Sequence, residues 1–153
     1  SQLYDRPHED ELQPNRDRME EQVIHYCVAH GIPIIATCRG MQYINVMFGG
    51  KLWYHPKLPV NRTRGVDHQV WLVKEQRNIW VNNYHSDCIY EEGLASCFEP
   101  LAIDRENHVV EAYGSDEMKI LALQWHPERR FETANAYEET RKIILDFIQK
   151  YVK

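Results

Sequence analysis

The chain of 153 residues lacks several features that mark whole classes of proteins. No apolar run approaches the ~20 residues needed to span a bilayer, and the polar first residues contain no apolar signal core. Basic residues are outnumbered by acidic ones, 18 against 23, and the net charge of −5 argues against nucleic acid or an anionic membrane as the main partner. The sequence therefore indicates a cytoplasmic protein that acts on small molecules or binds other proteins.

Closely spaced pairs of cysteines or histidines, which are typical of metal or redox sites, are also missing. The four cysteines, Cys27, Cys38, Cys88 and Cys97, form no Cys-x-x-Cys pair, and the eight histidines form no His-x-x-x-His pair with a nearby acid. We expect independent reduced thiols, no bound metal and no cofactor. Asn61 begins a glycosylation acceptor sequence, but without a secretory signal we interpret that match as coincidence.

The composition that remains is that of an ordinary globular domain. Hydrophobic residues make up 43% of the chain and charged residues 27%. A chain of this length folded on one core buries roughly 70% of the surface that its unfolded form exposes. We therefore expect residues 1–153 to form a single domain.

The first half of the chain alternates helical and strand patterns. After an irregular start of about fifteen residues, apolar spacing predicts a helix capped by Asn15 or Asp17 and ended by Gly31. Residues 33–37 predict a strand buried on both faces in a parallel sheet, and residues 41–48 predict a second helix. A helix followed by a buried strand is typical of an α/β fold.

The second half predicts five more strands and a final helix. We expect the strands at residues 68–73, 79–81, 100–104, 108–113 and 120–125, with a turn at 82–83 and a hairpin at 106–107. The last helix begins after Thr133 or Asn135 and continues to the C-terminus. The middle strands therefore predict an antiparallel extension of the α/β sheet.

A cysteine occupies the turn between the first predicted strand and the second predicted helix. The segment 36–40, Ala-Thr-Cys-Arg-Gly, has small residues two positions to either side of Cys38, which is the pattern of a nucleophile elbow. Free N–H groups and the dipole of the following helix are expected to lower the pKa of the Cys38 thiol. The alternative is an inert buried cysteine, the commoner state of an intracellular thiol.

A base and a carboxylate follow the last predicted strand. In the segment 124–128, Gln-Trp-His-Pro-Glu, His126 is placed to accept the thiol proton of Cys38 and Glu128 to hold the imidazole. Because ligands gather at strand ends in α/β sheets, the two motifs together predict a Cys-His-Glu triad. The alternative is a histidine that only caps a strand and a solvated glutamate.

Four segments in the same order resemble the class I glutamine amidotransferases. They are residues 38–42, the glycine pair 49–50, residues 81–85 and residues 124–128. An arginine after the cysteine and a Val-Asn-x-x-His segment are most similar to the branch of gamma-glutamyl-gamma-aminobutyrate hydrolases. The resemblance implies a flavodoxin-like three-layer α/β/α domain. It also implies hydrolysis of a gamma-glutamyl amide through a thioester on Cys38, without a cofactor.

The sequence also departs from that family pattern. The family's domain begins with further strands and helices and a Gly-Gly-x-Asp loop, which this sequence does not contain, so we expect an N-terminal segment or a separate chain to supply them. That loop would provide one oxyanion donor and the Arg39 N–H the other, and losing such a donor typically costs ~10²–10³ in kcat. Ala36, Asn83 and Asp87 replace the family's usual glycine, serine and glutamine, which leaves the substrate open.

The resemblance adds candidate oxyanion and substrate-binding residues to the triad. Arg39 is expected to act through its backbone N–H, although its side chain can also pair with a carboxylate. Gln42 can reach a glutamyl group or satisfy helix backbone, and His85 resembles a loop histidine that faces the substrate. Glu111 resembles a position near the substrate's amino group, or it faces water from an alternating strand.

Two alternatives to gamma-glutamyl amide hydrolysis remain open. One is a glutaminase subunit that passes ammonia to a synthetase, and the other is a non-catalytic binding protein of the same fold. The amine portion of the substrate is open between aminobutyrate, a polyamine product and an amino alcohol carried on a nucleotide. A homo-oligomer is also open.

Overall fold

The computed structural model describes residues 14–54, 56 and 63–152. The irregular start expected before residue 14 and the acceptor sequence at Asn61 lie outside these residues. The elements are α1 (Pro14–His30), β1 (Ile34–Thr37), α2 (Arg39–Met47), β2 (His68–Leu72), β3 (Arg77–Val81), β4 (Ile89–Tyr90), η2 (Glu91–Gly93), β5 (Glu99–Asp104), β6 (Val109–Ser115), β7 (Ile120–Leu123) and α3 (Ala136–Tyr151).

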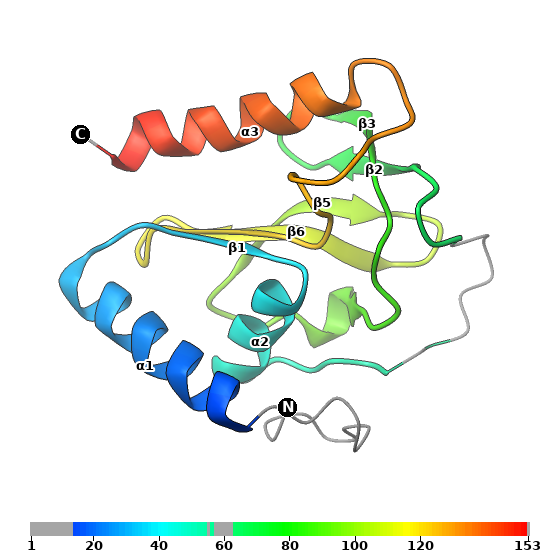
Figure 1. The fold of residues 1–153 in the computed structure, drawn as a ribbon. Helices are drawn as coiled ribbons and strands as arrows, with labels where there is room; N and C mark the ends of the chain where they lie inside the picture. Colours follow the sequence, from blue (N-terminus) through cyan, green and yellow to red (C-terminus); the bar gives the residue numbers. More distant parts are fainter. Residues whose placement is uncertain (1–13, 55, 57–62, 153) are drawn as a thin grey trace.

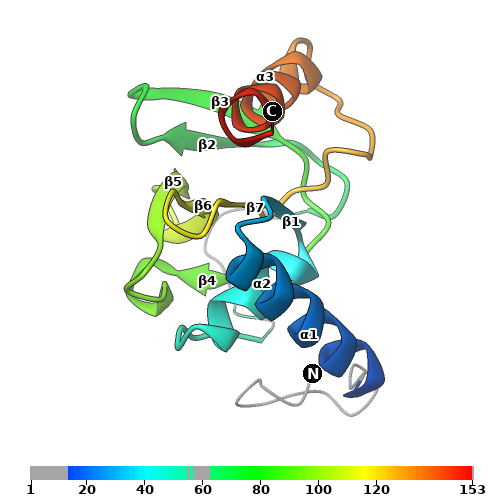
Figure 2. The ribbon, with the colours of Figure 1, turned by 90° about the vertical axis from the view of Figure 1, so that its left-hand side faces the viewer.

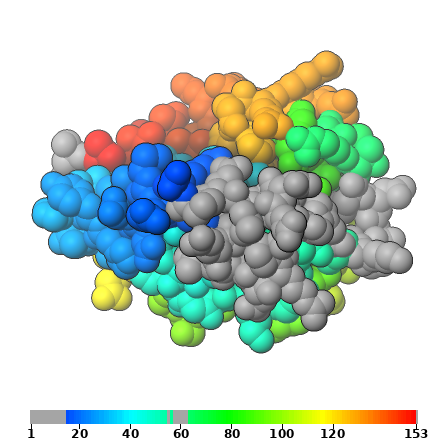
Figure 3. Space-filling view, turned by 60° about the horizontal axis from the view of Figure 1, so that its bottom comes forward, coloured from blue at the N-terminus to red at the C-terminus, as the bar shows by residue number. Residues whose placement is uncertain are grey.

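The strands form one seven-stranded sheet in the order β1-β7-β6-β5-β2-β3, with β4 paired to β6. β1 and β7 run parallel, and the remaining pairs are antiparallel. Helices α1 and α2 lie on one face of the sheet and α3 lies on the other (Figures 1 and 2). The space-filling view shows α1 at the surface of the lower face, with α3 along the opposite rim (Figure 3). The expected three-layer α/β/α architecture with an antiparallel extension is therefore confirmed.

Each face of the sheet has its own core because successive strand residues point to opposite faces. In β7, Ile120 and Ala122 join the core shared with α1 and α2, whereas Leu121 and Leu123 join the core under α3. All four residues of β7 are buried. β7, which lies between β1 and β6, is therefore a buried interior strand, and the predicted base and carboxylate follow its end.

Several local predictions need correction. β1 was expected to be buried on both faces, but Ile35 is 39% exposed because, among the described residues, β1 pairs only with β7. Helix α1 begins at Pro14, before both expected caps, because proline suits the first turn of a helix. β3 begins at Arg77, two residues earlier than expected, and the two-residue β4 was not predicted. Residues 82–83 do not form the expected turn, and they begin the irregular segment that leads from β3 to β4.

Within the described ranges, no helix has both the length and the apolar character required to cross a bilayer.

Gly93 provides a test of packing beside the sheet. A Cβ at this position would lie 2.2 Å from Cζ3 of Trp53 and 3.3 Å from the carbonyl oxygen of Lys51. We expect Gly93→Ala to lower the free energy of unfolding by about 1–3 kcal/mol, since the indole must shift. The control is Gly40→Ala, whose new Cβ meets Ala36 at an ordinary 3.6 Å and lies in a helix, so its stability should stay the same or rise by up to about 1 kcal/mol. Equal urea midpoints for the two variants would contradict this packing account.

Candidate active site

Cys38 lies at a sharp turn between β1 and α2. Its φ of 48° and ψ of −109° are unusual for a residue other than glycine and cost roughly 1–3 kcal/mol. The surroundings hold this conformation, because the Cys38 N–H donates to the Leu123 carbonyl at 2.8 Å and the Cys38 carbonyl accepts from Gln42 N–H at 3.1 Å. A strained cysteine between a strand and a helix is the geometry expected of a nucleophile elbow.

His126 and Glu128 form a hydrogen-bonded pair after β7. His126 Nδ1 lies 2.6 Å from Glu128 Oε1. Because an ionised carboxylate only accepts, Nδ1 carries the hydrogen of this contact, and Nε2 is the ring nitrogen that Glu128 does not engage. The expected orientation of an imidazole by a carboxylate is therefore present.

The sheet brings the two motifs to the same edge. Thr37 is the register partner of Leu123, so Cys38 and the segment leading to His126 follow the ends of neighbouring parallel strands. The charge of Glu128 acts on the Cys38 thiol, where it raises the pKa. The predicted convergence of distant segments therefore rests on the pairing of β1 with β7.

The expected effect on the thiol is corrected by the structure. Burial raises the pKa of Cys38 above its ordinary value, and the Arg39 N–H and the charges of Arg129 and Arg64 only partly offset this rise. The helix N-terminus acts in the predicted direction, but desolvation of the sulfur outweighs it. The folded chain therefore favours the neutral thiol of Cys38 over the thiolate.

Burial also acts on Glu128, but with the opposite outcome. Desolvation alone would raise the pKa of this carboxyl. The hydrogen bond from His126, the residue's own backbone N–H and the charges of His126 and Arg129 together hold the pKa below its ordinary value. Glu128 is thus kept ionised in the pH range where it can orient His126.

The side chain of Arg39 points to α1. Its Nη1 donates to Glu20 Oε2 at 2.7 Å, its Nη2 donates to Asp17, and its guanidinium lies 5.7 Å from the centroid of the Tyr43 ring. Only the backbone N–H of Arg39 faces the sulfur. This geometry agrees with the expectation that Arg39 acts through its main chain.

The other candidate residues meet in a buried polar cluster on the same sheet edge. Glu111 is fully buried, and its Oε1 lies 3.5 Å from His68 Nε2 and 3.6 Å from His85 Nε2. Gln42 donates to Gln124 Oε1 at 3.3 Å and to the Asp87 carbonyl at 3.2 Å, and neither group is helix backbone, the alternative expected for its amide. The structure thus brings together Glu111 and His85, and it adds His68, which the sequence analysis did not single out.

Asn82 is a second residue that the sequence analysis missed. Its fully buried amide donates to the His126 carbonyl at 2.8 Å and accepts from the His126 N–H at 2.9 Å. A further contact from the same amide reaches the Arg130 carbonyl at 3.4 Å. An asparagine directly after an apolar strand was interpreted as a turn, but its side chain pairs with the backbone of the candidate base.

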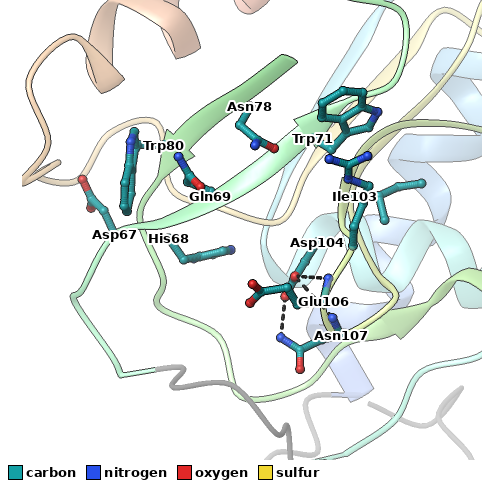
Figure 4. A pocket seen from close by; sticks show the side chains of 11 residues that line it. Asp67, His68, Gln69, Trp71, Asn78, Trp80, Ile103, Asp104, Glu106 and Asn107 are labelled. Carbon is teal, nitrogen blue, oxygen red and sulfur yellow. Dashed lines mark hydrogen bonds between the residues drawn. The ribbon is translucent and has the colours of Figure 1, made fainter. Parts of the chain in front are cut away.

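A cavity of about 330 Å³ lies beside this cluster, under β2, β3 and β5 (Figure 4). Trp71, Trp80, Asp104 and His68 are among its lining residues. His68 belongs both to the cavity and to the contact with Glu111. The cavity is therefore adjacent to the polar cluster.

The raised thiol pKa predicts how alkylation of Cys38 depends on pH. We expect the rate with iodoacetamide to be low at pH 7 and to keep rising past pH ~8.5, the ordinary cysteine value, because the folded state favours the neutral thiol. The measurement is peptide mass spectrometry of labelled Cys38 across pH 6–10, with the guanidinium-unfolded chain as control. Unfolding should lower the midpoint, and a folded midpoint below the unfolded one would contradict the dominance of burial.

Comparison with known proteins agrees with this architecture. The chain superposes on a glutamine amidotransferase from Thermotoga maritima with a TM-score of 0.59, covering 89% of this chain and 57% of that chain at 19% identity. The fold is that of the class I glutamine amidotransferases. The profile of the Peptidase C26 family matches residues 3–128, and the chain belongs to this family of cysteine-dependent hydrolases and amidotransferases.

Two curated relatives show how much of such a protein this chain represents. It is 31% identical to the glutamine amidotransferase-like protein YvdE of Lactococcus lactis, over 78% of this chain and 56% of the relative. It is 28% identical to the gamma-glutamyl-gamma-aminobutyrate hydrolase PuuD of Escherichia coli, over 78% of this chain and 55% of that protein. The chain therefore spans about half the length of these relatives.

Proposed function

We propose that this chain carries the catalytic residues of a cysteine hydrolase that cleaves the amide bond of a small gamma-glutamyl amine. Cys38 Sγ attacks the gamma-carbonyl carbon while His126 Nε2 takes the thiol proton. The C–N bond breaks, His126 gives that proton to the departing amine, and a gamma-glutamyl thioester remains on Cys38. Water then loses a proton to His126 and adds to the thioester, the C–S bond breaks to release glutamate, and His126 returns the proton to the sulfur to restore the thiol.

The observation that carries the proposal is the 2.6 Å contact between His126 Nδ1 and Glu128 at the end of β7, beside the Cys38 elbow. The contact leaves Nε2 as the proton acceptor, which a buried thiol with a raised pKa requires. The Arg39 N–H supplies one donor for the tetrahedral oxyanion. A second donor, together with a strand beside β1, is proposed to come from a segment that is not among the described residues.

The test is release of glutamate from a set of gamma-glutamyl amides and from L-glutamine. Turnover of gamma-glutamyl amides above that of L-glutamine supports the proposed hydrolase. Turnover of L-glutamine alone, with release of ammonia, would instead support a glutaminase subunit. Absence of turnover with every substrate, from this chain and from a longer protein that includes it, would favour a binding protein and contradict the proposal.

Asn82 provides a prediction about positioning. Asn82→Ala removes both hydrogen bonds to the His126 backbone, and we expect kcat to fall by about 10²-fold with little change in KM, since misplacing a catalytic group by ~1 Å costs that much. Asn82→Asp keeps an acceptor for the His126 N–H but places a buried carboxylate against the His126 carbonyl, so it should lose at least as much activity. Thermal melts of both variants separate misplacement from unfolding. Equal kcat in folded Asn82→Ala and wild type would contradict a role for Asn82 in positioning His126.

A further inference from the structure

Two arginines surround an aromatic ring beside the candidate base. The ring of Tyr84 packs edge-on against the ring of His126, with 5.8 Å between centroids. The guanidinium carbon of Arg129 lies 4.7 Å from the centroid of the Tyr84 ring, and that of Arg64 lies 5.8 Å from it. Arg64 Nη1 also donates to the Tyr84 carbonyl at 3.3 Å. Tyr84 thus places two cations next to His126.

The guanidinium groups of Arg64 and Arg129 differ from those of other arginines that form ion pairs. Arg39 and Arg77 form ion pairs with carboxylates at 3.0 Å or less, whereas in the described part of the chain neither Arg64 nor Arg129 has a carboxylate within 4 Å. Both residues are exposed, and both charges reach the sulfur, because each lowers the pKa of Cys38. Within the described residues, two arginines with no carboxylate within 4 Å therefore lie at the candidate nucleophile of a chain whose net charge is −5.

We propose that Arg64 and Arg129 bind a carboxylate of the substrate beside the scissile bond. The planar guanidinium presents N–H donors in a fork that matches a carboxylate, and stacking on Tyr84 holds the fork in place. The inference rests on the proposed hydrolase, whose substrates carry a carboxylate on the glutamyl group in every case and on the amine portion in some cases. The two guanidinium groups would bind a carboxylate in the same way whether it belongs to the glutamyl group or to the amine portion.

Alkylation tests this site without any need for turnover. Iodoacetate carries a carboxylate and iodoacetamide does not, and both react with the same thiolate, so the ratio of their rates is independent of the thiol pKa. We expect that ratio at Cys38 to exceed the ratio at the exposed Cys97 and at N-acetylcysteine. Each of Arg64→Gln and Arg129→Gln should lower it roughly 1.5- to 5-fold, as expected for partly exposed ion pairs.

Matched controls separate a carboxylate site from general charge. Arg141→Gln removes an exposed arginine on α3 and should leave the ratio unchanged, and Arg129→Lys should keep part of the preference. Raising the salt concentration from 0.1 to 1 M should reduce the preference at Cys38, because it shortens the Debye length to about 3 Å. A ratio at Cys38 no higher than that at Cys97, or one unaffected by both glutamine variants, would overturn the proposal.

Substrate kinetics then identify the source of the carboxylate. Two gamma-glutamyl amides are compared, one whose amine portion ends in a carboxylate and one in which that group is a methyl ester. If Arg129→Gln raises KM for the acid only, the arginines bind the amine portion; an equal rise for both indicates the glutamyl carboxylate. No change with either substrate contradicts the site. If wild type hydrolyses neither amide, the proposed hydrolase fails while the alkylation ratio still decides the carboxylate site.

Discussion

Cys38→Ala is expected to lower kcat for gamma-glutamyl amide hydrolysis by about 10⁶-fold, to the background of the uncatalysed reaction, because no thioester can form. The side chain is small and lies at an elbow whose hydrogen bonds all use the backbone, so alanine should preserve the turn. Glutamate release, measured with an enzyme-coupled assay, provides the rate. The variant should still bind substrate, since Arg39 N–H and the residues around Tyr84 are unchanged.

The matched control for this substitution is Cys97→Ala, which removes an exposed cysteine far along the chain from the elbow. It should retain the wild-type rate. Intact mass spectrometry during turnover adds an independent measurement, because the thioester should add the mass of one gamma-glutamyl group to wild type and not to Cys38→Ala. Hydrolysis by Cys38→Ala at more than a small fraction of the wild-type rate would eliminate the thioester route.

The parts of the site that the sequence predicted are those set by local pattern. Cys38 stands between an apolar strand and a helix, and His126 and Glu128 directly follow another apolar strand. Since parallel neighbours place such ends on one edge, the position of each motif in its own segment was enough to predict the juxtaposition. The helices and most strands were predictable because the spacing of their apolar residues is also a local pattern.

The remaining features depend on contacts between distant segments. The direction of the thiol pKa shift was predicted wrongly because the helix N-terminus is visible in the sequence, whereas the burial that outweighs it follows only from the folded chain. The pairing of Asn82 with the His126 backbone joins residues 44 positions apart, and the Arg39 side chain reaches carboxylates on α1 about 20 positions earlier. No spacing rule within one segment reports such contacts.

The exposure of β1 is another feature that depends on contacts between distant segments. A run of apolar residues predicted a strand covered on both faces, and the composition of β1 is that of a central strand. In the described residues it has one neighbour, and Ile35 is exposed at 39%. This mismatch between sequence character and position in the sheet agrees with the proposal that a further strand lies beside β1 in the active enzyme.

His126→Gln is the second substitution with a very large expected effect, a loss of about 10⁴- to 10⁶-fold in kcat. Glutamine keeps the backbone groups that pair with Asn82 and is close in size to histidine, so the loop should stay in place. It cannot take a proton from a thiol whose pKa burial has raised, and thus both thioester formation and hydrolysis should stop.

Two measurements distinguish this loss of a base from a damaged site. Iodoacetamide should still label Cys38 in folded His126→Gln above pH 9, because hydroxide then provides the thiolate that His126 no longer generates. Glu128→Gln should lose less, up to about 10⁴-fold, since the imidazole remains while its orientation weakens. If His126→Gln were as active as wild type, the thiol would have to be deprotonated by another group, and the 2.6 Å contact between His126 and Glu128 would serve the loop rather than the reaction.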